Sequence, residues 1–533
     1  MAHFAFVVPY DQYALGARTL SSVLKQLGHS VSLIILKTVH HNRDPENLQV
    51  ADGYHAEQAC CSETEYSLVR DLLLLRHPDF IGLSFSSPSF GLAAWLTERF
   101  HEDFPEVPVV WGGVDATLNP ELAIKHADYV FVGEAEETLP VFVDKQMAGG
   151  DVSDIPGLWT EKDGRSIRNP PAQLIQDLDR IPFPDFTLEN KYLVEENAAR
   201  EVDYHYFVIM TQRGCPFRCS FCANSQLAGM YEGQKYLRRR SVENVIAELR
   251  AVRKLHPNLE FIEFYDDIFT VNKSWLRTFA ERYRSEVNLP FWCYTYPGVC
   301  DGETADLLKQ AGVAFVQVGI QSGSQRTLRE VFRRVDPGKV SETARILSDR
   351  GIPGRYDLIA GNPFETEQDH LESLEVLLEI PHPFRMNPIN PLTFFENTPI
   401  TRMAKDGGIP LRRIEGANAY YAEDQKEYSF WKSLYQLPQY PQLEKDFIRS
   451  LTRGGHFRSH PLDLEAMVSG LERLYWHTAS FCSTKEEYTH VLEDRLSETR
   501  SRLAAAQARL TGIEGKYLYK VYRKARRFVF GEE

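Results

Sequence analysis

Short apolar segments alternate with amphipathic segments over the first 150 residues of the chain. Five segments have the β-branched and aromatic composition of buried strands: 4–8, 31–36, 80–85, 107–111 and 129–132. Segments with a helical spacing of apolar residues lie among them, at 15–27, 66–75 and 92–104. Nearly continuous apolar strands that alternate with helices predict a parallel sheet covered on both faces. We therefore expect residues 1–150 to form a doubly wound, flavodoxin-like α/β domain.

Small residues follow three of these predicted strands. Ligands of doubly wound domains bind at the carboxyl ends of the strands, and small residues let a large flat ligand approach the backbone. The candidate ligand-binding residues are Ser84, Ser86, Gly112, Gly113, Val114, Gly133 and Glu134. Ordinary strand-to-helix turns have the same composition, so the pattern alone leaves both interpretations open.

A second alternating pattern runs from about residue 201 to residue 395. Strands are predicted at 206–211, 261–265, 291–296, 315–320, 355–360 and 384–392. Helices are predicted at 242–255, 275–285, 304–310, 340–348 and 368–378. Six β-α units are too few for a closed eight-stranded barrel, so we expect a partial (β/α)6 barrel. Its chemistry should belong to the loops that follow the strands.

The remaining segments have a different character. Residues 151–200 contain clustered prolines without clear periodicity, which predicts an extended connector. Residues 396–533 are predicted to be a helical C-terminal region. Its end, 516–530, interleaves six basic residues with aromatic ones, which is typical of a peripheral contact with an anionic membrane but equally of a solvated helix end.

Composition narrows the class of protein. The chain has 533 residues, a formal charge of −14, 43% hydrophobic residues and 25% charged residues, as in ordinary soluble proteins. No apolar run approaches the roughly 20 residues of a membrane-spanning helix, and the first strand lacks the flanks of a signal peptide. The acidic charge argues against non-specific nucleic-acid binding. We expect a cytoplasmic enzyme, placed in the reducing cytoplasm by its eight cysteines without a secretion signal.

Three of the cysteines stand in the sequence RGCPFRCSFC at residues 213–222, directly after the first strand of the second pattern. The spacing C-x3-C-x2-C allows Cys215, Cys219 and Cys222 to bind one metal centre. Three thiolates could bind zinc together with a fourth ligand from elsewhere. They could equally bind three irons of a [4Fe–4S] cluster and leave the fourth iron open.

This motif resembles the signature of the radical S-adenosylmethionine (SAM) superfamily, in which an aromatic residue precedes the last cysteine. The resemblance implies that Cys215, Cys219 and Cys222 bind a [4Fe–4S] cluster and that Phe221 lies against the adenine of SAM. It also implies that the open iron binds the amino and carboxylate groups of SAM. An electron then cleaves SAM to a 5′-deoxyadenosyl radical, with flavodoxin or ferredoxin as the expected electron donor.

Further short motifs follow the later strands in the order of that superfamily. Asp266 and Asp267 stand where the family usually has a motif that binds the SAM amino group, and the sequence does not distinguish between them. Gln321 and Ser322 resemble the ribose-contacting turn, although glutamine replaces the commoner glutamate. Gly361 and Pro363 resemble the adenine-side GxP turn. These residues complete the implied SAM site.

The N-terminal domain resembles the cobalamin-binding domain that precedes many radical SAM barrels. The resemblance assigns the seven small-residue positions above to cobalamin (B12). Many such domains carry an Asp-x-His-x-x-Gly motif whose histidine binds cobalt, whereas this chain has Asp11, Tyr13 and Gly16 at those positions. Cobalt without a histidine ligand is therefore expected, and loss of cobalamin altogether remains an alternative.

These resemblances imply a cobalamin-dependent radical SAM enzyme. The leading hypothesis is methylation of an unactivated carbon in a small-molecule or lipid-like biosynthetic intermediate, through the 5′-deoxyadenosyl radical and methylcobalamin. A cyclisation or rearrangement without methyl transfer is the alternative within the superfamily. A zinc-stabilised, non-catalytic binding protein is the alternative from another class. The substrate itself is not readable from the sequence.

Overall fold

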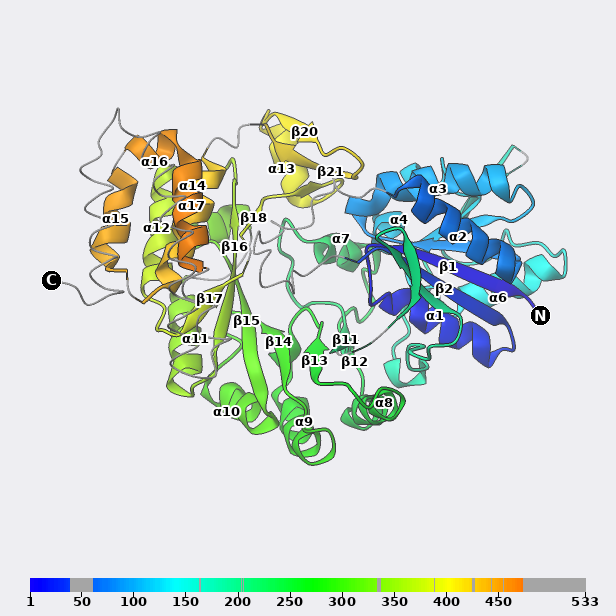
Figure 1. Ribbon diagram of the computed structural model, residues 1–533, viewed down its shortest axis with the longest axis horizontal. Helices are drawn as coiled ribbons and strands as arrows, with labels where there is room; N and C mark the ends of the chain where they lie inside the picture. The colour runs from blue at the N-terminus through cyan, green and yellow to red at the C-terminus, as the bar shows by residue number, and fades with distance from the viewer. Residues whose placement is uncertain are drawn as a thin grey trace.

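The computed structural model describes residues 1–38 and 61–472, apart from residues 163, 203, 205, 333–336, 388, 424–426, 442 and 454. Within this part, two parallel sheets with their helices lie side by side, and a smaller C-terminal region adjoins both (Figure 1). The predicted tail at 516–530 lies outside the described residues. No helix in the described ranges has both the length and the apolarity needed to cross a membrane.

The N-terminal sheet is doubly wound, as predicted. Its central strands are parallel: β1 (His3–Pro9), β2 (Ser30–Leu36), β3 (Phe80–Ser84), β4 (Val109–Gly112) and β5 (Tyr129–Phe131). Side chains of α1 (Leu15–Gln26) and α6 (Thr138–Met147) pack with one face of the sheet. Side chains of α2 (Glu63–Arg76) and α3 (Phe90–Asp103) pack with the other face. Short helices α4 (Val114–Leu118) and α5 (Pro120–Ala123) follow β4.

Residues 151–200 differ from the expected extended connector. They supply β6 (Leu158–Lys162), β7 (Arg165–Arg168) and β8 (Lys191–Glu195), and β9 (Ala198–Glu201) follows. These strands extend the N-terminal sheet to the order β7-β6-β5-β4-β3-β1-β2-β8-β9. β7 and β9 lie at the two edges of the sheet, where strands need few apolar residues and are commonly charged. β6 and β8 pair with them and each carry a lysine and a glutamate within five residues, so hydrophobic periodicity does not reveal these strands. Only the proline-rich stretch between β7 and β8 keeps the character of a connector.

The second sheet is the expected partial barrel. Its parallel strands are β10 (Tyr206–Ile209), β13 (Phe261–Phe264), β14 (Phe291–Thr295), β15 (Val313–Gln321), β16 (Gly354–Ala360) and β17 (Phe384–Met386). The helices that connect them are α8 (Val242–Leu255), α9 (Lys273–Glu286), α10 (Gly302–Ala311), α11 (Gly338–Asp349) and α12 (Glu367–Leu378). Along β16 the burial alternates: Tyr356, Leu358 and Ala360 are buried among helix residues, while Arg355, Asp357 and Ile359 are partly exposed on the concave face.

The described part of the C-terminal region is helical but also contains a small antiparallel sheet. Its helices are α13 (Pro399–Asp406), α14 (Tyr428–Gln436), α15 (Lys445–Arg453), α16 (Gly455–Ser459) and α17 (Pro461–Glu472). The sheet contains β19 (Phe394–Phe395), β21 (Ala419–Ala422) and β20 (Leu411–Arg413), in that order. Its strands have two to four residues, which is too short for a periodic pattern. β18 (Asn390–Pro391) pairs with β16.

The turn between β20 and β21 packs against the N-terminal domain. The amide of Gly91 donates to the carbonyl of Gly416 over 2.6 Å, and the amide of Asn418 donates to the carbonyl of Ser87 over 3.0 Å. A Cβ on Gly91 would lie 2.7 Å from the Gly416 Cα atom. Glycine is therefore required at Gly91 by the close approach of two segments far apart in the sequence.

Gly91→Ala should destabilise the protein by about 1–3 kcal/mol, because the added methyl group overpacks this contact. The measurement is the thermal unfolding midpoint. Gly470→Ala in α17 is the matched control, since a Cβ there meets no described atom within 4 Å and alanine has the higher helix propensity. Equal midpoints for the two variants would contradict this account of the contact.

Candidate functional site

A cavity of about 370 Å³ lies at the carboxyl ends of the N-terminal strands and reaches the barrel. One side is formed by the face of the sheet that α1 covers, including Phe4 and Phe6. The side formed by the barrel includes Gln212 and Arg213, which follow β10. The proline-rich stretch between β7 and β8 adds Leu178, Ile181, Pro182 and Pro184. The cavity therefore lies between the two sheets.

Most of the residues predicted to bind cobalamin line this cavity: Ser84, Gly112, Gly113, Gly133 and Glu134. The other two are exposed: Ser86 lies in the loop after β3, and Val114 is the first residue of α4. Cβ atoms added to Gly16 and Gly112, which also line the cavity, would meet no described atom within 4 Å. Gly16 and Gly112 thus leave open space beside the ends of the strands, and this lining suits the close approach of a large flat ligand such as cobalamin.

Tyr13 occupies the loop position at which many related domains have a cobalt-binding histidine. Asp11 shapes the loop by accepting the amides of Tyr13 and Ala14 over 3.0 and 2.9 Å. The Tyr13 hydroxyl donates to Glu263 on β13 over 3.1 Å, and its ring lies 6.0 Å from that of Tyr265. The loop therefore connects the N-terminal domain to the concave face of the barrel.

The three motif cysteines lie in a loop that is closed at its base by two short strands. Antiparallel pairing of β11 (Gln212–Arg213) with β12 (Arg238–Arg239) places Arg213 opposite Arg238. The cysteines stand between β11 and α7 (Ala223–Met230), and all three are free thiols. Cys219 is buried, whereas Cys215 and Cys222 are partly exposed. Phe221 packs edge to face against Phe332, with ring centroids 4.9 Å apart.

The environment of these thiols suits a cationic metal centre. Burial, together with Asp267 and the other two motif cysteines, raises the pKa of Cys215 to about 12. Iron binding would relieve this cost, because the thiolate is the metal ligand. Among the described residues, no three His, Cys, Asp or Glu side chains are grouped to hold a single metal ion. A [4Fe–4S] cluster places each thiolate on a different iron, so its cysteines need not meet at one point.

The two neighbouring aspartates after β13 have different surroundings. Asp266 is fully buried and accepts the amides of Thr211 and Gln212 over 2.6 and 2.9 Å, as well as the Thr211 hydroxyl. Asp267 is exposed and accepts the Asn224 side-chain amide over 3.0 Å. The same Asn224 amide lies 3.8 Å from the Cys222 sulfur. Asp266 therefore fixes the base of the cysteine loop, and Asp267 is the carboxylate accessible to a ligand beside the cysteines.

The turns after β15 and β16 contain the remaining SAM-binding candidates. Gln321 is partly exposed at the end of β15 with φ 70°. Ser322 is 1% exposed, and its hydroxyl donates to Glu365 over 2.8 Å, so it supports the turn from within. Gly361 and Pro363 are partly exposed. Between them, the buried amide nitrogen of Asn362 has no partner among the described residues, which fits a turn that binds a hydrogen-bonding ligand.

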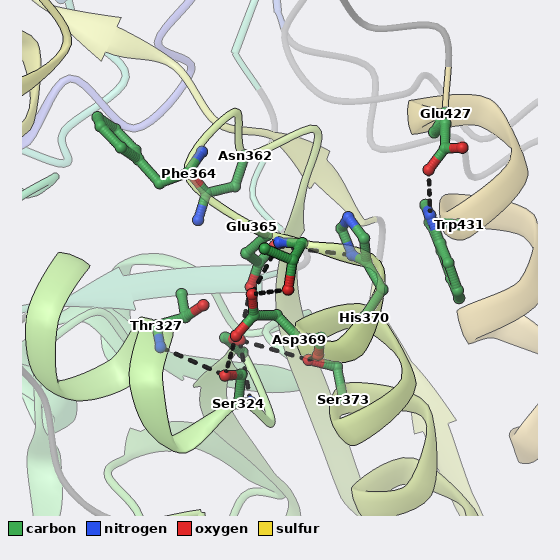
Figure 2. A network of polar contacts seen from close by, with 12 residues as sticks. Ser324, Thr327, Asn362, Phe364, Glu365, Asp369, His370, Ser373, Glu427 and Trp431 are labelled. Atoms are coloured by element: carbon green, nitrogen blue, oxygen red, sulfur yellow. Dashed lines mark hydrogen bonds and ion pairs between the residues drawn. The ribbon is translucent and has the colours of Figure 1, made fainter. Parts of the chain in front are cut away.

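A polar network beneath these turns connects them to the C-terminal region (Figure 2). Ser324 donates to Asp369 over 2.5 Å, and the Asp369 carboxylate also pairs with Arg326. His370 lies 3.7 Å from Glu365 and stacks on Trp431 of α14, with ring centroids 4.6 Å apart. Burial raises the pKa of Glu365 to about 7 and lowers the pKa of His370 to about 4. At neutral pH, His370 is therefore uncharged.

Sequence reasoning missed an ionic junction between the two sheets. Glu134 accepts two hydrogen bonds from Arg238 over 2.6 and 2.9 Å and lies 3.3 Å from Arg213, which also pairs with Glu136 over 2.5 Å. Although burial alone would raise it, these arginines hold the pKa of Glu134 below its usual value. Charged pairs some 80 to 100 positions apart leave no local signal, although Arg213 directly precedes the cysteine motif.

Two family models match the chain. The first is the B12 binding domain, over residues 4–143. The second is the Radical SAM superfamily, over residues 209–377. The two matches coincide with the doubly wound sheet and the partial barrel. They identify an enzyme, against the hypothesis of a zinc-stabilised binding protein.

The curated relatives include methyltransferases and a cyclase. An uncharacterized methyltransferase of Pyrococcus horikoshii is 28% identical, covering 61% of this chain and 68% of the relative. Cytidylyl-2-hydroxyethylphosphonate methyltransferase of Streptomyces wedmorensis is 26% identical, covering 64% and 67%. The anaerobic magnesium-protoporphyrin IX monomethyl ester cyclase of Synechocystis is 23% identical, covering 70% and 69%.

Two solved structures share the fold of most of the chain. The radical SAM methyltransferase TsrM of Kitasatospora setae, with cobalamin and a [4Fe–4S] cluster bound, has a TM-score of 0.59 at 16% identity and covers 88% of this chain and 99% of its own. The radical enzyme OxsB, with aqua-cobalamin and SAM bound, has a TM-score of 0.60 at 15% identity and covers 99% and 84%. The order of the two sheets is therefore that of cobalamin-dependent radical SAM enzymes.

Glu365→Gln should change how stability depends on pH. Glu365 stays protonated in the folded protein up to its pKa of about 7, whereas the unfolded chain releases that proton near the ordinary glutamate pKa of 4.5. The folded state thus binds more protons between these values, and wild-type stability falls as the pH rises through them. The substituted glutamine cannot ionise, so the variant should gain up to about 3 kcal/mol relative to wild type from about pH 4.5 to 7.

Urea unfolding midpoints at a series of pH values measure this difference. His370 is present in both proteins, so its own titration largely cancels in the comparison. Glu372→Gln in α12, the helix that begins two residues after Glu365, is the matched control. A difference between Glu365→Gln and wild type that stays constant with pH would show that the carboxyl group of Glu365 is not held protonated.

Proposed function

Because the chain belongs to the radical SAM superfamily and carries a B12-binding domain, we propose that it methylates an unactivated carbon of a small-molecule or lipid-like substrate. One observation carries the proposal. Glycines at the carboxyl ends of β4 and β5 line the same cavity as Gln212 and Arg213, which directly precede the cysteine loop. A methyl-carrying cofactor and a radical-generating one would thus face the same space.

When bound, cobalamin supplies a methyl group, and the [4Fe–4S] cluster with SAM supplies a 5′-deoxyadenosyl radical. The thiolates of Cys215, Cys219 and Cys222 hold the cluster in this proposal. The Asp267 carboxylate accepts hydrogen bonds from the SAM ammonium group, a charge-assisted contact of the stronger kind. Gln321, Gly361 and Pro363 flank the nucleoside, while Gly16 and Gly112 leave room for the corrin.

Other residues of the chain position these groups and exclude water. The ion pairs of Arg213 and Arg238 with the N-terminal domain hold the cysteine loop at the edge of the cavity. The proline-rich stretch between β7 and β8 covers the cavity with Ile181, Pro182 and Pro184. Exclusion of water prevents loss of reactive intermediates. A flavodoxin or ferredoxin is proposed as the electron donor.

A second candidate function is cyclisation or rearrangement without methyl transfer. The Synechocystis cyclase covers 70% of this chain, more than the 61% covered by the Pyrococcus methyltransferase. The two functions differ in their use of SAM. A methyltransferase makes S-adenosylhomocysteine, whereas an enzyme that uses SAM only as a radical source does not.

The anaerobically reconstituted protein should form about one equivalent of S-adenosylhomocysteine per bound cobalamin from SAM and a low-potential reductant, before any substrate is added. Tritium from [methyl-³H]SAM should remain with the protein. Cys222→Ala should lose the brown iron–sulfur colour and at least about 100-fold of 5′-deoxyadenosine formation, because one cluster ligand is missing. Normal 5′-deoxyadenosine formation without S-adenosylhomocysteine in the wild type would favour the cyclase instead.

The two aspartates after β13 should differ when each is replaced by asparagine. Asp267→Asn should weaken SAM binding about tenfold, by loss of a charge-assisted contact, while the unfolding midpoint stays near that of wild type. Asp266→Asn should lower stability by about 1–3 kcal/mol, because a buried acceptor of several hydrogen bonds is altered. Equilibrium dialysis with SAM and thermal unfolding measure the two effects. The reverse pattern would assign the SAM ammonium group to Asp266.

A further inference from the structure

A wall of aromatic rings crosses the concave face of the barrel. It begins at Tyr13 of the N-terminal domain, whose ring lies 6.0 Å from that of Tyr265. Tyr265 meets Trp292 at 5.3 Å, and Trp292 stacks on Phe315 at 5.8 Å with an interplanar angle of 11°. Tyr265 directly follows β13, and Trp292 and Phe315 lie on β14 and β15; Figure 1 labels these three neighbouring strands. The Tyr13–Tyr265 and Tyr265–Trp292 contacts are tilted by 51° and 61°, so the wall is a continuous apolar surface whose flat part is the stacked pair Trp292 and Phe315.

Arg355 stands at the end of this wall. Its guanidinium carbon lies 3.7 Å from the centroid of the Phe315 ring. No hydrogen bond or ion pair joins Arg355 to any of the residues that the structure describes. Burial, with the nearby Arg385, lowers the pKa of Arg355 to about 10, so the side chain remains charged at neutral pH. A stacked guanidinium uses its face and leaves its in-plane N–H donors for a planar anion.

The carboxylates closest in the fold have other partners. Asp357, two residues along β16, accepts hydrogen bonds from the side-chain amides of Gln317 over 2.8 Å and Asn387 over 2.6 Å. Glu263 on β13 accepts the hydroxyl of Tyr13. Both carboxylates act on Arg355 only through their negative charge. This charge raises the pKa of Arg355, whereas burial lowers it. The positive charge on the concave face therefore lacks a direct counter-ion within the described protein.

Distance along β16 separates Arg355 from the proposed SAM site. Ala360 lies five residues after Arg355 along β16, and the Gly361 turn begins directly after it. At a rise of roughly 3.3 Å per residue, these positions are about 17 Å apart along the strand. The SAM carboxylate belongs at the cluster, beyond the carboxyl ends of the strands. An anion at Arg355 thus belongs to a different molecule.

We propose that Arg355 binds a carboxylate or phosphate group of the substrate, whose apolar or aromatic body lies along Tyr265, Trp292 and Phe315. The substrate class is an elongated organic acid with its reacting carbon at the end nearest Tyr13 and the cavity. This inference rests on the proposed function only in taking the concave face as the substrate site. The aromatic wall supplies contact area, and Arg355 sets the direction in which the substrate enters.

Two dyes that differ by one acidic group test the proposal. 8-Anilinonaphthalene-1-sulfonate carries an anion on the ring system that N-phenyl-1-naphthylamine presents without charge. Equilibrium dialysis of each dye against the anaerobic holoenzyme gives its Kd. Arg355→Met should weaken binding of the sulfonate at least about tenfold, because a charge-assisted contact is lost, and should change the neutral dye less than twofold. Arg355→Lys should recover part of the sulfonate affinity.

The matched control is Arg345→Met, at an exposed arginine on α11, which should leave both dyes unchanged. Sulfonate binding that is unaffected by Arg355→Met, or an equal loss of both dyes, would overturn the inference. The dye measurement does not depend on methyl transfer. A wild-type protein that makes no S-adenosylhomocysteine yet binds the sulfonate through Arg355 would overturn the proposed function and leave this inference standing.

Discussion

The relative position of the two sheets depends on the ionic junction at the base of the cysteine loop. Pairing of β11 with β12 brings Arg213 and Arg238 side by side, and both reach carboxylates that follow β5. Removing one partner from such a pair leaves an uncompensated charge at a cost of about 3–5 kcal/mol when it is buried, so the arrangement tolerates little displacement. The two arginines flank residues 214–237, which include the three cysteines. The ion pairs therefore hold the cysteine loop beside the cavity between the two sheets. The proposed methyl transfer would require such a fixed geometry, because the reacting groups must be held close together and in line.

The C-terminal region strengthens the same arrangement from the opposite side. Trp431 and Tyr435 of α14 pack on His370 of α12, which belongs to the network under the Ser322 turn. The turn between β20 and β21 meanwhile reaches the N-terminal domain at Gly91. The region thus connects the turns after β15 and β16 with the N-terminal domain. Burial lowers the pKa of the connecting His370 and keeps it neutral.

Hydrophobic patterns along the sequence predicted the elements of this structure whose residues are close together in the chain. Apolar strands with helical spacing between them predicted both parallel sheets, and the family matches and solved structures confirm the fold. Strands β6 to β9 were missed, because β7 and β9 are edge strands and all four carry charged residues instead of a periodic apolar face. The sequence also did not show which of Asp266 and Asp267 is buried and which is accessible to a ligand. This difference depends on which carboxylate accepts hydrogen bonds from the Thr211 and Gln212 amides, and these amides are some 55 residues away in the sequence.

The acidic charge of −14 and an anionic substrate are compatible for a physical reason. Surface carboxylates are screened over about 8 Å at physiological ionic strength, whereas charges inside a partly enclosed face interact with less screening. Arg355 lies on such a face, against Phe315, and the nearby Asp357 is already hydrogen-bonded to amides. The local field at the end of the aromatic wall is therefore set by Arg355 and the charged groups near it, Arg385, Asp357 and Glu263, and not by the net charge. Net charge governs solubility and encounter rates, while the residues of the concave face govern which substrate is retained.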